Sequence, residues 1–188
     1  MQALLDAAEE VFGETSYERA SIAEITRRAG VAQGTFYLYF PDKRAVFVEL
    51  VKKLNRGLRH FIAMRLEGVE SRLAAERQGL LAFFEYTTEH RALYKVVREA
   101  EFVDEEIYLW HYRTLTEGYV RGLRQAMESG EISDDISPET MALAIMGINQ
   151  LLGSMWIIVE RQQPPDEVID EIMTFVARGV GADPEVGR

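Results

Sequence analysis

A short segment near the N-terminus combines side chains that can hydrogen-bond to nucleic acid. It contains, in chain order, Gln33, Gly34, Thr35, Tyr37, Tyr39 and Lys43. A glutamine amide can bind adenine through two hydrogen bonds, and a threonine methyl can contact the thymine methyl. Tyrosine hydroxyls and a lysine ammonium can bind phosphate oxygens. The residue types and their spacing therefore indicate contact with DNA.

The flanking sequence predicts the helices that hold this segment in place. Ser21 and Glu24 form a capping box that starts one short helix, and Gly30 is its expected left-handed end. A second short helix covers about 33–39, because Pro41 disfavours helical geometry in the residue before it. Two short helices joined by a tight turn form a helix-turn-helix, whose second helix enters the major groove.

The distribution of charge supports a DNA contact by one part of the chain. The net charge is −10, yet residues 19–53 contain 7 basic and 3 acidic residues, against 13 and 23 in residues 57–188. A basic segment in an acidic chain indicates that only that segment meets nucleic acid. Arg27 lies in it, and for this residue a solvated helix face is an equally good interpretation.

The rest of the sequence also predicts helices, and no strand pattern stands out. Apolar residues recur at helical spacing in a long helix over about 43–66. Later helices are predicted within 70–100, from Asp104 to about Ser129, from Ser137 to about Arg161, and from Asp166 onward. The sequence therefore predicts an all-α chain.

The segment 141–159 contains no charged residue and is nearly long enough to cross a membrane. Asn149 and Gln150 lie in its middle, however, and a helix that is apolar all round can be buried on two sides. We expect no membrane contact, and we expect this helix to pack on its own core and on a second copy of the chain. Aspartate in place of Ile148 or Ile157 should then produce monomers.

The quoted motif is specific to one family. The stretch "SIAEITRRAGVAQGTFYLYFPDKRAVF" closely resembles the DNA-binding domain of TetR-family transcriptional regulators, over about residues 3–51. The resemblance implies about nine helices, with a three-helix helix-turn-helix domain over 1–45 and a helical ligand-binding and dimerisation domain over 46–188. It also implies a cytoplasmic homodimer, formed through the last two long helices, on palindromic operator DNA. Its expected DNA-binding residues are Ser21, Arg27, Gln33, Gly34, Thr35, Tyr37, Tyr39 and Lys43.

Two positions depart from the family pattern. Ser16 stands where the family often has a glycine at the end of the first helix, which costs about 1 kcal/mol if the residue is left-handed. Ala32 stands where the family often has serine, so the recognition helix lacks its usual cap side chain.

The second half of the chain is rich in aromatic residues, as ligand pockets are, although core packing is the alternative for each one singly. Residues 90–115 loosely resemble relatives that sense acyl-CoA thioesters, and the acidic chain suits a lipophilic cation equally. Both effector classes therefore stay open. The expected ligand-binding residues are Phe84, Tyr94, Arg98, Phe102, Trp110, Arg113, Asn149, Gln150 and Trp156.

Together these features predict a ligand-responsive repressor that a small hydrophobic effector releases from its operator. Catalysis has little support, because His60, His90 and His111 have no glutamate three residues earlier and no Gly-rich phosphate loop is present. We expect no enzyme activity, no metal and no cofactor. One alternative is a helical small-molecule-binding protein or enzyme that carries a helix-turn-helix without operator control. Another is an architectural DNA protein without ligand control.

Overall fold

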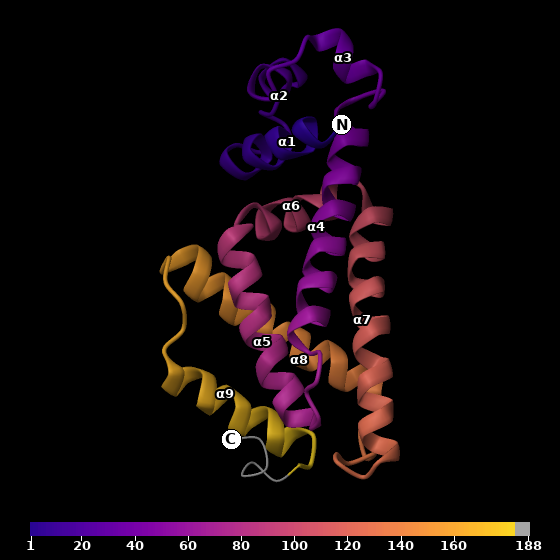
Figure 1. Cartoon of the computed structure of the whole chain (residues 1–188), viewed down its shortest axis with the longest axis vertical. Coiled ribbons are helices and arrows are strands. Elements are labelled where there is room, and N and C mark those ends of the chain that lie inside the picture. Colours follow the sequence, from indigo (N-terminus) through magenta and orange to yellow (C-terminus); the bar gives the residue numbers. More distant parts are fainter. Residues whose placement is uncertain (183–188) are drawn as a thin grey trace. The chain divides into compact units, whose positions relative to one another are not determined.

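The computed structural model describes residues 1–182, which form helices and no strand within that range (Figure 1). The predicted all-α fold is confirmed. The chain divides into two compact units. Unit 1 comprises residues 1–57 and 90–112, and unit 2 comprises residues 58–89 and the described residues from 113 onward. This division follows packing, so the functional boundary expected at residue 45 stays a prediction.

Unit 1 contains three N-terminal helices, the first part of a long helix, and later helices. In chain order these are α1 (Gln2–Glu14), α2 (Ile22–Arg28), α3 (Gln33–Tyr37), the start of α4 (Lys43–Arg65), α6 (Ala92–Val103) and the start of α7 (Glu105–Glu128). Helix α1 packs on α2 and α6, and α2 packs on α3 (Figure 1). Phe12, Phe36 and Phe47 are fully buried in this unit.

Side-chain caps begin α2 and the long helix α4, and a left-handed glycine follows α2; the cap at Ser21 and the glycine at Gly30 are at the predicted residues. The Ser21 hydroxyl accepts a hydrogen bond from the backbone N–H of Glu24 (3.1 Å), and the Asp42 carboxylate accepts one from that of Ala45 (2.8 Å). Gly30 has φ 66°, the left-handed geometry expected after α2. The helix-turn-helix therefore follows from local signals that are visible in the sequence.

Two local expectations are wrong. The Glu24 carboxylate binds the guanidinium groups of Arg27 and Arg28, because charge-assisted bonds are stronger than the capping-box bond to a backbone amide. Ser16 is not left-handed: within residues 1–182, Arg161 is the only non-glycine residue with positive φ. The chain leaves α1 without the strain that a left-handed Ser16 would bring.

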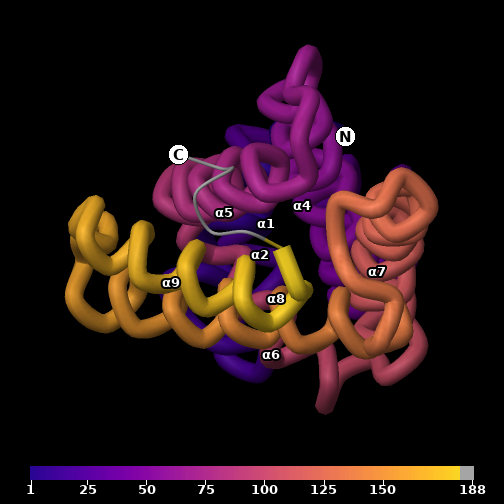
Figure 2. The backbone as a smooth tube through the Cα atoms, turned by 90° about the horizontal axis from the view of Figure 1, so that it is seen from below, coloured from indigo at the N-terminus to yellow at the C-terminus, as the bar shows by residue number. Residues whose placement is uncertain are grey.

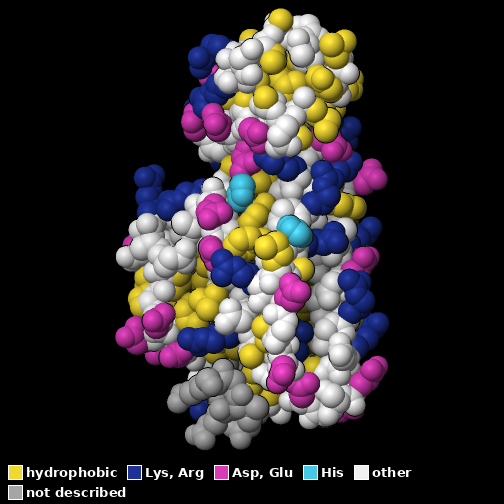
Figure 3. Space-filling view, viewed as in Figure 1, with side chains coloured by type: hydrophobic (Ala, Val, Ile, Leu, Met, Phe, Trp, Pro, Cys, Tyr) yellow, Lys and Arg dark blue, Asp and Glu magenta, His cyan; other side chains and the backbone are white. Residues whose placement is uncertain are grey.

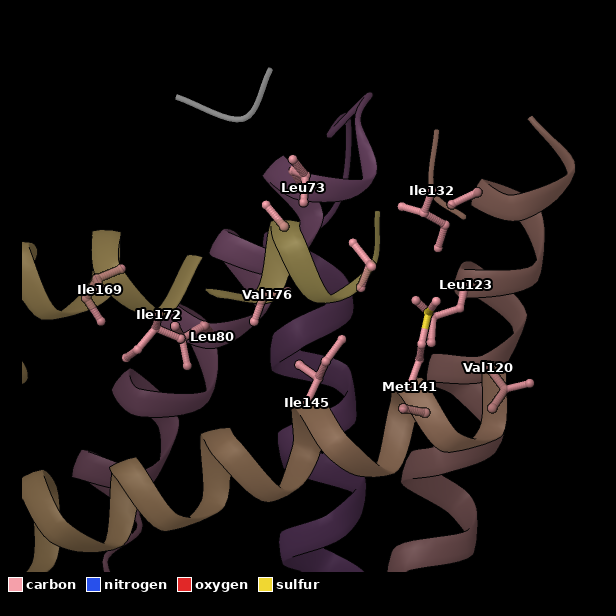
Figure 4. Packing of buried hydrophobic residues seen from close by; sticks show 14 of the residues in the cluster. Leu73, Leu80, Val120, Leu123, Ile132, Met141, Ile145, Ile169, Ile172 and Val176 are labelled. Atoms are coloured by element: carbon pink, nitrogen blue, oxygen red, sulfur yellow. The ribbon is translucent and has the colours of Figure 1, made fainter. Parts of the chain in front are cut away.

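Unit 2 is built around a buried hydrophobic cluster. Its elements are the end of α4, α5 (Arg72–Glu89), most of α7, α8 (Pro138–Gly153), the π-helix η1 (Ser154–Val159) and α9 (Asp166–Gly179). Both α8 and α9 pack on α5 (Figure 2). Leu80 of α5, Ile145 of α8 and Ile172 of α9 belong to this cluster (Figure 4).

The apolar helix begins as predicted but changes form before it ends. The Ser137 hydroxyl accepts a hydrogen bond from the backbone N–H of Thr140 (3.3 Å), and Pro138 occupies the first turn. From Ser154 to Val159 the helix is a π-helix, which the apolar pattern did not predict. A π turn alters which side chains face the core, and here Ile157 is 1% exposed.

The apolar helix is largely uncovered by its own chain. By length and composition alone, Pro138–Val159 could cross a membrane, yet only 22% of its most apolar window is buried. A core helix of a single chain would be mostly buried. Most of this window is therefore not buried by the described residues.

Candidate DNA-binding and ligand-binding sites

Helix α3 begins with the three residues expected to read bases. Gln33 and Gly34 are exposed and Thr35 is half-buried. Ala32 precedes them in an extended conformation and provides no side-chain cap, as its identity predicted. The start of α3 therefore carries no charged side chain and is accessible to a ligand.

No neighbouring atom in the structure requires a glycine at position 34. A Cβ placed on it would meet no heavy atom within 4 Å beyond its neighbours and its own helix, and its φ is not left-handed. Glycine in a helix costs about 1 kcal/mol relative to alanine. The glycine therefore leaves open space at the start of α3, and such space allows a ligand to come close to the backbone.

The aromatic residues around α3 divide sharply by exposure. Phe36 and Phe40 are buried, whereas Tyr37 and Tyr39 are 53% and 50% exposed. Leu38 between them is 79% exposed. Hydrophobic side chains are visible on the surface over α3 in Figure 3. Core packing therefore explains the two phenylalanines but not the two tyrosines, whose hydroxyls can reach a partner.

Ser21 and Arg27 already have partners within α2. The Ser21 hydroxyl caps the helix, and the Arg27 guanidinium donates two hydrogen bonds to Glu24 (2.8 and 2.7 Å) while staying 70% exposed. Hydrogen bonds from Arg27 and then Arg28 lower the Glu24 pKa to about 2. A phosphate at Arg27 would therefore share the guanidinium with an ionised carboxylate.

Lys43 lies at the start of α4, and its ammonium faces its own chain. The Nζ atom donates to the carbonyl oxygens of Tyr17 (2.7 Å), Glu18 (3.3 Å) and Ala20 (3.0 Å). It also lies 4.5 Å from the centroid of the Tyr17 ring. An ammonium has three N–H donors, and in this arrangement they are directed at backbone carbonyl oxygens, so the phosphate contact that the sequence predicted stays a prediction.

The predicted ligand-binding residues are shared between the units. In unit 1, Tyr94 is buried, Trp110 is half-buried, Arg98 is exposed and Phe102 is 87% exposed. At that exposure Phe102 lines no enclosed space within unit 1.

In unit 2, Phe84 is fully buried in the hydrophobic cluster, so its ring is used in core packing. Asn149, Gln150 and Trp156 are half-buried, and Arg113 is exposed. Neither unit by itself brings all nine residues together.

Sequence reasoning missed a buried polar pair in unit 1. Asn55 and His111 are both buried, and the Asn55 amide donates to the His111 carbonyl oxygen (3.1 Å). The same amide nitrogen lies 3.2 Å from His111 Nδ1. Burial lowers the His111 pKa to about 4, so the imidazole is neutral at neutral pH. A polar residue on the apolar face of α4 was the available signal.

A second buried polar cluster lies in unit 2. The Glu76 carboxylate accepts hydrogen bonds from Arg72 Nε (2.8 Å) and from the Tyr119 hydroxyl. Burial raises the pKa of Tyr119, and the neighbouring Glu76 raises it further. These groups satisfy one another, so the cluster is structural. Within residues 1–182, no group of three or more His, Asp or Glu side chains could hold a metal ion.

Comparison with known proteins extends the similarity beyond the N-terminal motif. The family model for bacterial regulatory proteins of the tetR family matches residues 4–50. The HTH-type transcriptional regulator YvdT of Bacillus subtilis is 28% identical over 181 residues, which cover 95% of this chain and 93% of that protein. The fatty acid metabolism regulator protein of Bacillus subtilis is 22% identical, with coverages of 94% and 93%.

Solved structures share the fold over nearly the whole chain. FadR from Bacillus subtilis in complex with stearoyl-CoA has a TM-score of 0.79 at 21% identity, over 95% of this chain and 98% of that one. The fatty acid degradation regulator FadR from Bacillus halodurans has a TM-score of 0.80 at 20% identity and 93% coverage of both. These relatives are transcriptional regulators, and the expectation that the chain is not an enzyme is confirmed.

Proposed function

Since the chain belongs to the TetR family of transcriptional regulators, we propose that it represses transcription as a homodimer bound to palindromic operator DNA. In this proposal a small hydrophobic effector, an acyl-CoA, releases the dimer from the operator. A repressor of this kind acts in the cytoplasm, where its operator lies. The alternative, a ligand-binding protein without operator control, predicts no sequence-specific binding to duplex DNA.

The surface of α3 is the observation that carries operator binding. Gly34 leaves open space where the chain itself needs none, and exposed Gln33 precedes it. A glutamine amide can read adenine bidentately if the backbone comes close to the base edges. Tyr37 and Tyr39 are exposed on either side of Leu38 and supply hydroxyls for phosphate oxygens.

The exposed apolar surface of unit 2 supports the homodimer. Large apolar side chains on α8, η1 and α9 are 48–66% exposed: Leu143, Leu151, Met155, Val159 and Phe175. Hydrophobic side chains are visible on this part of unit 2 in Figure 3. Large exposed apolar surface of this kind is typical of an interface. A two-fold dimer would cover the same patch on both chains, and its symmetry would match a palindromic operator.

The fatty-acid regulators among the relatives support an acyl-CoA effector. FadR from Bacillus subtilis was solved with stearoyl-CoA. In unit 2 of this chain, half-buried Trp156 suits an acyl chain, and exposed Arg113 suits the phosphates of coenzyme A. The acidic composition still makes a lipophilic cation the proper competitor in any test.

Operator binding can be tested by selecting duplexes from a random-sequence library with the full-length chain. We expect enrichment of a palindrome whose half-sites are centred about one helical turn apart or a multiple of it. The selected duplex should bind at least about 10³-fold more tightly than unselected duplex. A selection that enriches no sequence would refute operator control and favour the alternative.

Effector control can be tested by calorimetry with stearoyl-CoA, with and without the selected duplex. A shift from 99% bound to 99% released needs about 5.5 kcal/mol of differential affinity. Linkage requires that the duplex weaken effector binding by the factor by which the effector weakens duplex binding. Unacylated coenzyme A and tetraphenylphosphonium are the controls. Equal stearoyl-CoA affinities in the two titrations would show that this ligand does not control the DNA.

A further inference from the structure

The Arg28 guanidinium joins α2 to α1 in unit 1. Its Nη2 atom donates a hydrogen bond to the Glu14 carboxylate at the end of α1 (2.6 Å), and its Nε atom donates one to Glu24, one turn earlier in α2 (2.8 Å). The Nη1 atom lies 3.6 Å from a carboxylate oxygen of Glu10. The three nitrogens of one guanidinium therefore face three carboxylates, two on α1 and one on α2.

Arg27 and Arg28 are adjacent, yet they differ in what they bind. The Arg27 side chain is 70% exposed, and it donates two hydrogen bonds to Glu24 within α2. The Arg28 side chain is only 23% exposed and reaches a second helix. Its hydrogen bond lowers the pKa of Glu14 below the ordinary value, so this carboxylate is ionised at neutral pH. The link between α1 and α2 is thus made by Arg28, whereas Arg27 binds within its own helix.

Helix α2 is short and depends on its neighbours. It has 7 residues, and isolated helices shorter than about 12 residues are marginal in water. The Ser21 hydroxyl caps its first turn, and Ile25 and Thr26 are buried. Arg28 is its last residue, directly before the turn at Gly30 that leads to α3. Arg28 therefore anchors the end of α2 from which the chain enters α3.

We propose that Arg28 is a positioning residue for operator recognition, whose guanidinium joins Glu14 of α1 to Glu24 of α2 and so fixes the approach of the chain to α3. The proposal rests on the proposed operator binding, in which Gln33 at the start of α3 must meet base edges from a fixed position. Single exposed ion pairs contribute little, but a network of several charges around one arginine is the case in which they matter. The role is internal to unit 1 and needs no contact between Arg28 and DNA.

Arg28→Lys separates the charge of this side chain from its geometry. The guanidinium presents donors on three nitrogens in a planar fork, whereas the lysine ammonium is one compact group on a flexible stem. An ammonium therefore cannot hold Glu14 and Glu24 in the way that the fork does. The variant keeps the net charge of the chain, so the non-specific attraction to DNA should stay the same.

The first experiment measures the affinity of the parent, Arg28→Lys and Arg28→Met for the selected duplex and for unselected duplex. We expect Arg28→Lys to bind the selected duplex about fivefold or more weakly, as when one base contact is lost, and to bind unselected duplex like the parent. Arg28→Met should lose at least as much affinity for the selected duplex. Parent-like binding of both duplexes by Arg28→Lys would show that only the charge matters and would overturn the proposal.

Two glutamates of α1 provide a matched pair with the opposite charge. Glu14→Ala and Glu10→Ala remove the same charge one turn apart, but Glu14 accepts a hydrogen bond from Arg28 whereas Glu10 lies 3.6 Å away. Charge alone predicts that both variants bind DNA equally and more tightly than the parent. We expect instead that Glu14→Ala lowers the ratio of selected to unselected affinity by about twofold or more, and that Glu10→Ala leaves it unchanged.

A double variant shows whether Glu14 acts through Arg28. If it does, Glu14→Ala should lower the ratio no further in a chain that already carries Arg28→Met, because the two residues share one interaction. Independent contributions to stability would instead add. Equal ratios in Glu14→Ala and Glu10→Ala, or additive effects in the double variant, would overturn the proposal.

Hydrogen exchange of the DNA-free chains tests the same proposal independently of the operator. The amides of residues 29–31 donate to carbonyl oxygens of α2, and Arg28→Lys should accelerate their exchange. Lys52→Met removes a cation on α4, where Lys52 pairs with Glu49, and should not. Circular dichroism melting verifies that the variants remain folded. Parent-like exchange in Arg28→Lys would overturn the proposal even if operator binding is confirmed. Failure of the duplex selection would instead refute the proposed function and leave this measurement standing.

Discussion

Two exposed apolar surfaces differ in chemistry as much as in place. The α3 surface consists of Tyr37, Leu38 and Tyr39 in unit 1, beside Gln33 and Gly34. The second surface, on α8, η1 and α9 of unit 2, is defined by Leu143, Leu151, Met155, Val159 and Phe175. The first combines apolar bodies with hydroxyl and amide tips, whereas the second carries no polar atom on these five side chains.

The difference indicates which partner suits each surface. DNA presents phosphates and hydrogen-bonding base edges, so a surface that binds it needs donors at defined positions. A second copy of the chain presents the same apolar patch, and burial of that patch is sufficient to favour association. We therefore propose that polar groups at the ends of the exposed side chains distinguish a DNA-binding surface from a dimer surface.

A charged substitution on the unit 2 surface should have the largest effect on dimerisation and operator affinity. Leu151 and Phe175 are 66% and 65% exposed, so aspartate at either position should leave each chain folded. It should block dimerisation, because two charges would be buried without partners. Analytical ultracentrifugation should show monomers, and operator affinity should fall to the non-specific level, a loss of about 10³-fold or more.

The choice of residue decides what this experiment can show. Ile157, which the apolar pattern suggested for the same test, is 1% exposed and belongs to the core cluster. Aspartate there should unfold unit 2 and would say nothing about the interface. Two folded variants, Leu151→Asp and Phe175→Asp, that both remain dimeric would show that another surface carries the dimer.

Acidification should destabilise unit 1, because it favours protonation of the buried His111. Burial lowers the His111 pKa from its ordinary value near 6.5 to about 4, so between these values the unfolded chain binds a proton that the folded chain excludes. The contribution of neutral His111 to the free energy of unfolding is therefore complete above about pH 6.5. It decreases by about 3 kcal/mol as the pH drops to about 4. Urea unfolding at several pH values measures this loss.

A matched variant isolates the histidine from the carboxylates that also titrate in acid. His111→Gln removes the imidazole and keeps an amide that can meet Asn55. The variant should be less stable than the parent at pH 7, yet its stability should decrease less between pH 6.5 and 4. An unchanged pH dependence would exclude His111 as its source.

Local signals in the sequence were enough for most of the fold and for the α3 surface. Ser21, Ser137 and Gly30 act within three or four residues of themselves, and the structure uses each as predicted. The carbonyl contacts of Lys43 were not predictable, because its partners lie 23 to 26 residues away and only the folded turn brings them together. The π-helix at 154–159 was not predictable either. The segment is apolar nearly throughout, so it has no periodic pattern that would show where the helix changes form.

Changing Gln33, which we propose to read a base, should have an intermediate effect on operator affinity. Gln33→Ala removes the amide from the start of α3 and should leave folding unchanged, because Gln33 is exposed. Affinity for the selected duplex should fall by about 1–3 kcal/mol, whereas affinity for unselected duplex should barely change. Fluorescence anisotropy with both duplexes measures the ratio. An unchanged ratio between them would remove Gln33 from the residues that read bases.

The smallest expected effect comes from the two hydroxyls of the α3 surface. Tyr37→Phe and Tyr39→Phe each remove one oxygen and keep the ring, and neither ring belongs to the core. Losing the hydrogen bond from a hydroxyl to a charged phosphate should weaken selected and unselected duplex alike, by about tenfold. The salt slope should stay constant, because no charge is removed. If the tyrosines acted only by their apolar bodies, as Leu38 must, both variants would bind DNA like the parent. Tyr37→Leu would then be equally tolerated, and the α3 surface would lose the polar distinction that separates it from the surface of unit 2.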